Sequence, residues 1–76
     1  MNKKKKFNFK LGDKTKDIWA GDFVSECEYI GNLEEGRMLF YDITFECFRR
    51  VFIDIDEDGN PGLNGWRCED RPSKLL

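Results

Sequence analysis

The fold is decided by one stretch of the sequence, Met38–Asp56 (MLFYDITFECFRRVFIDID). It is the densest apolar and aromatic run in the chain, and it ends in a cluster of turn-forming residues, Asp56–Gly62. A chain of 76 residues buries only about 60–65% of its extended surface on folding. Nearly every large apolar side chain must therefore contribute to the core, and we expect this stretch to supply most of it.

Alternation of apolar and polar residues predicts that the stretch is strand. On one face, which we expect to point inward with Cys47, lie Tyr41, Ile43 and Phe45, and on the other lies Asp42. The same alternation continues through Val51 and is interrupted only by Arg49. The β-branched and aromatic composition of the stretch also suits a pleated surface. A single strand of this length would span about 60 Å, so we expect a break at Phe48–Arg50, where the alternation falters. The alternative is a short helix within residues 44–52, because apolar residues also recur there at spacings of three and four.

The rest of the chain has the short strands and frequent turns of a β protein. Further strands are predicted where alternation resumes, over Phe7–Leu11, Phe23–Ile30 and Leu63–Glu69, and glycine-containing turns separate them. We therefore expect an all-β fold, a small meander or partly open barrel of about five strands, SH3-like or OB-like in size. An α+β fold is the alternative. Residues 1–6 are expected to form a basic flexible arm, 7–70 a single domain and 71–76 a tail.

The three cysteines are widely spaced and the chain has no histidine. The odd number and the absence of a secretory leader favour reduced thiols and a cytoplasmic location. No apolar run reaches the ~20 residues of a membrane-spanning helix, so we expect no membrane partner. Without histidine, and without a recognisable nucleophile or phosphate-binding motif, we expect no enzymatic activity.

Charge is distributed unevenly along the chain. Residues 1–16 carry seven lysines and one aspartate, whereas residues 17–70 carry fourteen acids and four arginines. An acidic body favours a protein partner with a basic surface, because complementary charge speeds encounter. The lysines of the arm suggest a nucleic-acid-binding module as an alternative, although the acidic body would repel phosphate.

The acidic turn resembles the start of a calcium-binding loop. Its oxygen-bearing residues have the spacing of an EF-hand loop, with glycine at the sixth position: Asp54, Asp56, Asp58 and Asn60. The twelfth position, however, is Gly65 instead of the bidentate glutamate, and the eighth is Pro61. A polar β-turn is therefore the favoured interpretation, because Asp-Gly and Asn-Pro-Gly are turn signals in themselves, and weak calcium binding is the functional alternative.

Two arginines interrupt the apolar stretch, and aromatic residues flank them. Arg49 and Arg50 are either edge charges that prevent aggregation or contacts to a partner, with Phe48 and Phe52 as anchors. Two tryptophans, Trp19 and Trp66, are further candidates for exposed contact residues. Together these features predict a small non-catalytic protein-binding module, a regulator or an inhibitor.

Overall fold

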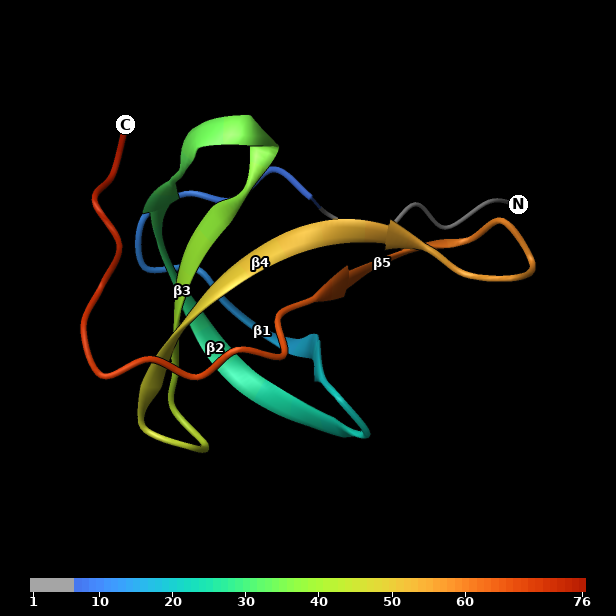
Figure 1. Ribbon diagram of the computed structural model, residues 1–76, viewed down its shortest axis with the longest axis horizontal. Coiled ribbons are helices and arrows are strands. Elements are labelled where there is room, and N and C mark those ends of the chain that lie inside the picture. The colour runs from blue at the N-terminus through green and yellow to red at the C-terminus, as the bar shows by residue number, and fades with distance from the viewer. Residues whose placement is uncertain (1–6) are drawn as a thin grey trace.

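Five strands form a closed barrel in the computed structural model, which describes residues 7–76 (Figure 1). The strands are β1 (Lys14–Ala20), β2 (Phe23–Asn32), β3 (Met38–Asp42), β4 (Cys47–Ile55) and β5 (Pro61–Asn64). A single 3-10 turn, Glu34–Gly36, connects β2 to β3. The expected all-β fold of five strands is confirmed, and the barrel is closed.

The strands are arranged in the order in which they occur along the chain. Each consecutive pair is antiparallel. Since direction reverses at every step, the fifth strand runs the same way as the first, and the barrel closes through a parallel pair. That pair is short, with Ile18 opposite Leu63 and Trp19 opposite Asn64. Closure leaves fewer unpaired strand edges than an open sheet would.

The core is formed by inward-facing residues of all five strands: Ile18, Cys27, Tyr29, Met38, Phe40, Val51 and Leu63. Two aromatic residues that precede β1, Phe7 and Phe9, pack against this cluster. The ring of Phe9 lies 5.1 Å from that of Phe40 and 5.7 Å from that of Tyr29. The strand expected over Phe7–Leu11 is not formed: Phe7 and Phe9 pack on the core, but residues 7–10 adopt no regular secondary structure and Leu11 is exposed.

The break in the central stretch lies earlier than its sequence predicts. The chain reverses at residues 43–46, and β4 continues without interruption through residues 48–50. The Asp42 carboxylate accepts a hydrogen bond of 2.9 Å from the Phe45 amide, and Glu46 adopts a positive φ of 57°. Asp42 is consequently buried, whereas Ile43 and Phe45 are exposed, so the predicted inward face was wrong here. Residues 44–52 contain no helix.

Arg49 points into the barrel together with its neighbours on alternate positions, Cys47 and Val51. Its Nε donates a hydrogen bond of 2.5 Å to the Asp42 carboxylate, and a second guanidinium nitrogen donates to the Gly65 carbonyl at 3.0 Å. Removing a charge from water is costly unless a partner compensates it, and Asp42 does so here. This burial corrects the expected surface placement of Arg49.

A disulfide joins Cys47 to Cys68, with their Cα atoms 5.6 Å apart, so the expectation that all cysteines are reduced was wrong. After β5 the chain returns along β4, where Phe48 and Glu69 exchange backbone hydrogen bonds of 2.8 and 2.9 Å. This pairing brings together two cysteines that lie 21 residues apart. Disulfides are typical of oxidising compartments, so the cytoplasmic expectation loses the support it drew from reduced thiols. Only Cys27 is a free thiol within residues 7–76.

Candidate functional site

A groove on the outer face of β4 gathers arginine and aromatic side chains. Arg50 and Phe52 lie on the outward positions of β4, opposite in direction to Arg49 and Val51. They line a cavity of about 170 Å³ together with residues from two other segments. We call this set the arginine–aromatic groove: Arg37, Arg50, Phe52, Trp66 and Arg67. Arginine and tryptophan are the residue types most enriched at the energetic centres of protein interfaces.

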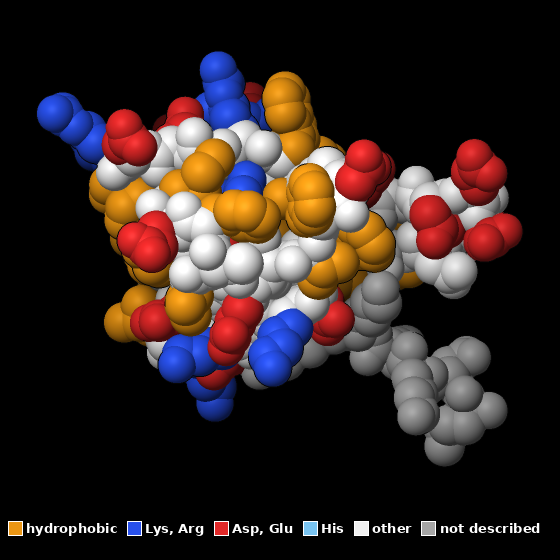
Figure 2. Space-filling view, turned by 90° about the horizontal axis from the view of Figure 1, so that it is seen from below, with side chains coloured by type: hydrophobic (Ala, Val, Ile, Leu, Met, Phe, Trp, Pro, Cys, Tyr) orange, Lys and Arg blue, Asp and Glu red, His pale blue; other side chains and the backbone are white. Residues whose placement is uncertain are grey.

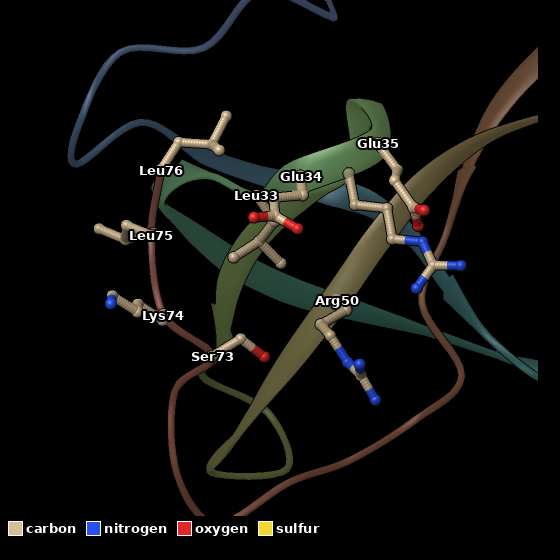
Figure 3. A pocket seen from close by; sticks show the side chains of 9 residues that line it. Leu33, Glu34, Glu35, Arg50, Ser73, Lys74, Leu75 and Leu76 are labelled. Atoms are coloured by element: carbon tan, nitrogen blue, oxygen red, sulfur yellow. The ribbon is translucent and has the colours of Figure 1, made fainter.

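A larger cavity of about 570 Å³ adjoins the groove and shares Arg37 and Arg50 with it. Figure 3 shows Arg50 projecting from β4, with Ser73 to Leu76 running along the opposite side and the 3-10 turn above. Arg50 donates a hydrogen bond of 3.2 Å to the Glu69 carboxylate. Because both groups are partly exposed, this ion pair holds the groove wall only weakly.

The segment after β5, residues 65–69, carries Trp66 and Arg67 and is fastened to β4; we call it the strap. The disulfide and the Phe48–Glu69 backbone pair hold its far end. At its near end, Gly65 is buried against β4, where an added Cβ would lie 2.8 Å from a methyl carbon of Val51. Only glycine fits there without displacing the core. The strap therefore holds one wall of the groove at both ends.

The residues expected to bind calcium lie at the tip of the β4–β5 hairpin, which protrudes from the barrel (Figure 1). The Asp56 carboxylate accepts hydrogen bonds from the amides of Asp58, at 3.0 Å, and Asn60, at 2.8 Å. These bonds close the polar turn that the sequence favoured over a metal loop. Within residues 7–76 no group of three or more acidic or cysteine side chains is placed to hold a metal ion. Calcium binding stays a prediction.

Exposed hydrophobic side chains gather at the end of the barrel formed by the β1–β2 and β3–β4 turns. Figure 2 faces this end and shows hydrophobic side chains near the middle, with acidic side chains and some Lys or Arg side chains around them. We call it the apolar end, and it comprises Trp19, Phe23, Val24, Ile43 and Phe45. Phe23 is 66% exposed and Phe45 47%, and their ring centroids lie 6.3 Å apart. Phe45 also covers the Arg49 guanidinium at 5.5 Å.

Of the six contact residues predicted from the sequence, the structure brings Arg50, Phe52 and Trp66 together. Trp19 lies at the apolar end, and it also lines a cavity of about 170 Å³ with Asp54, Asp56 and Asn60. Phe48 is half-buried, with its ring 5.1 Å from that of Tyr41.

Six surface residues of these two sites were not predicted from the sequence: Arg37, Arg67, Phe23, Val24, Ile43 and Phe45. Phe23 and Phe45 belong to alternating runs in which other members, Cys27 and Cys47, are buried. Their exposure follows from their places beside a turn, where the neighbouring strands end. No sequence pattern around Arg37 or Arg67 marks either residue as part of a site. Their proximity to Arg50 depends on the register of β3 and on the strap.

The free thiol of Cys27 lies in the core beside the Asp42–Arg49 pair. Burial raises the pKa of Cys27 to about 12, and the nearby Asp42 carboxylate acts in the same direction. A cysteine acts as a nucleophile or metal ligand in its thiolate form. Cys27 is thus a packing residue at neutral pH.

Comparison with protein-family models, with curated proteins and with solved structures finds no match for this chain. Within the described part of the chain, no helix has the length and apolar character needed to cross a membrane. The lysines of residues 1–6, on which the nucleic-acid alternative rests, lie outside the described residues.

Proposed function

We propose that this protein is a non-catalytic protein-binding module, a regulator or inhibitor, whose apolar end contacts a partner with a basic surface. The observation that carries the proposal is the pair of touching, exposed aromatic rings of Phe23 and Phe45. Apolar patches with polar rims are typical of interaction sites on soluble domains. Aromatic side chains at such sites supply much of the binding free energy.

The charge around the apolar end supports a basic partner. The segments that build it, residues 19–28 and 42–46, contain Asp and Glu but no Lys or Arg. Asp22 and Glu46 flank the two aromatic rings in the sequence and are exposed. The one guanidinium beneath Phe45, that of Arg49, is paired with Asp42. A partner that presents lysine or arginine around an apolar centre matches this surface.

The turn that carries Phe45 is well suited to hold its ring in place. Asp42 bonds to the Phe45 amide, and the Ile43 amide donates to the Glu26 carbonyl at 2.8 Å. The Glu26 amide in turn donates to the Thr44 hydroxyl at 3.0 Å. A loop ordered before binding loses less conformational entropy when it meets its partner.

The test compares proteins retained from extract by the immobilised wild-type chain and by the double variant Phe23→Ser/Phe45→Ser. Each protein retained only by the wild type is then purified and titrated against both chains by calorimetry. We expect the double variant to bind at least about tenfold more weakly, since each aromatic anchor contributes about 2 kcal/mol. We also expect wild-type affinity to fall as salt is added.

The matched control is Leu11→Ser, which removes another exposed apolar side chain at a position outside the apolar end. It should bind as the wild type does. Binding that the control weakens as much as the double variant, or that persists unchanged in the double variant, contradicts the proposal. Circular dichroism of each variant verifies that the barrel is intact.

A further inference from the structure

The outer face of β4 changes from basic to aromatic to acidic along its length. Because side chains alternate across a strand, Arg50, Phe52 and Asp54 point outward in succession, about 7 Å apart. The arginine–aromatic groove adds Arg37 and Arg67 to the basic end. The acidic end continues into the hairpin tip, and residues 51–66 contain no lysine or arginine.

The centre of this face is aromatic, with Phe52 and Trp66 in the groove and Trp19 two strands away, beyond the polar Asn64. Phe52 pairs with Asn64 of β5, and Asn64 pairs with Trp19 of β1. Trp66, which is 69% exposed, lies beside Phe52 in the groove. An aromatic centre therefore separates two ends of opposite charge.

From this order we propose that a second copy of the chain binds to this face, forming a two-fold symmetric dimer. A two-fold axis that lies in the interface beside Phe52, perpendicular to the strand, sets the two β4 strands face to face and antiparallel. Arg50 of each copy then lies opposite Asp54 of the other. An interface of this kind uses the same patch on both subunits, which must be self-complementary. A face that is basic at one end, aromatic at the centre and acidic at the other end meets that requirement.

The groove gives the acidic hairpin of the second copy a place to lie. Three arginines line the smaller cavity and no acidic residue does, and of these arginines Arg50 is paired with Glu69. The hairpin offers four exposed carboxylates: Asp54, Asp56, Glu57 and Asp58. Ile55, 61% exposed, adds apolar surface to the same hairpin. Charge complementarity thus selects the chain's own hairpin as occupant.

The test exchanges the charges of the two ends. One variant carries Arg37→Glu and Arg67→Glu, which spares the Arg50–Glu69 pair. The other carries Asp54→Lys and Glu57→Lys, which spares Asp56, the residue that closes the turn. Sedimentation equilibrium at low ionic strength is measured for the wild type, for each variant alone and for their equimolar mixture.

We expect the wild type to dimerise, with an affinity that falls as salt is added. Each variant alone should dimerise at least about tenfold more weakly, because like charges then face each other. The equimolar mixture should form a heterodimer, because both of its contacts pair opposite charges. The unchanged acidic hairpin of the first variant meets the unchanged basic groove of the second. The basic hairpin of the second variant meets the acidic groove of the first.

The control Lys14→Glu/Lys16→Glu reverses two exposed charges at the start of β1 and should dimerise as the wild type does. A wild type that stays monomeric, or a mixture that gains no dimer over its components, overturns the proposal. So does a groove that retains an acidic partner protein while the wild type remains monomeric. The variant Phe23→Ser/Phe45→Ser should dimerise normally, so failure of the dimer leaves the proposed function of the apolar end to its own test.

Discussion

Burial of the Cys27 side chain makes the stability of the folded barrel depend on pH. The pKa of its thiol is about 12 in the folded protein, against an ordinary value of 9.0. As pH rises from about 9 to about 12, the unfolded chain releases this proton while the folded chain keeps it. The stabilising contribution is therefore complete below pH 9 and is lost as pH rises towards 12.

We predict that the free energy of unfolding falls more steeply with pH in the wild type than in Cys27→Ala over this alkaline range. Ionisation of the other side chains is common to both proteins and cancels in the difference. Urea unfolding at a series of pH values measures both slopes. Two parallel pH profiles would show that ionisation of Cys27 is not linked to folding.

At the residue scale, the alternation of apolar and polar residues correctly placed Cys47 and Val51 on one inward face. It treated Arg49, which lies between them, as an interruption. A charge in an apolar row normally marks a break, because its burial requires a partner. That partner, Asp42, was assigned to the outer face. The β3–β4 register, which sets Asp42 opposite Cys47, creates the pair, and a local pattern contains no such information.

At the scale of elements, the β3–β4 turn was not predicted because its residues are typical of strands. Ile43, Thr44 and Phe45 are β-branched or aromatic, so they favour strand. The structure places them in the turn because Asp42 bonds to the Phe45 amide and Glu46 accepts the left-handed conformation. The turns at Gly21 and Gly59 follow the ordinary preference of glycine for positive φ, and these were predictable.

Detaching the strap from β4 should lower the free energy of unfolding substantially. The Cys47–Cys68 disulfide closes a loop of 21 residues, and a cross-link of this length stabilises a small domain by about 3 kcal/mol through the unfolded chain. We predict that Cys47→Ala/Cys68→Ala unfolds at a correspondingly lower urea concentration. The matched control is the wild type with its disulfide reduced, which should show a similar loss. Unchanged midpoints for both would mean that the strap contributes no stability through its cross-link.

At the scale of the whole molecule, the number and length of the apolar runs indicated the fold class. A short all-β chain with turns between runs favours a small barrel. Closure depends on the pairing of β1 with β5, which involves residues far apart in the sequence. The groove depends on three separate segments. The sequence therefore identified Arg50, Phe52 and Trp66 as surface candidates without showing that they share one site.

At this scale β4 has two faces, with Arg49 inside the barrel and Arg50 on its surface. Arg49→Gln leaves the Asp42 carboxylate buried without its charged partner, which costs about 3–5 kcal/mol. Arg50→Gln breaks a partly exposed pair with Glu69, which contributes about 1 kcal/mol or less.

The measurement that tests this division most directly is urea unfolding of the wild type, Arg49→Gln and Arg50→Gln side by side. We predict a large loss of the free energy of unfolding for Arg49→Gln and a small one for Arg50→Gln. Equal losses for the two adjacent arginines, or a larger loss for Arg50→Gln, would contradict the account.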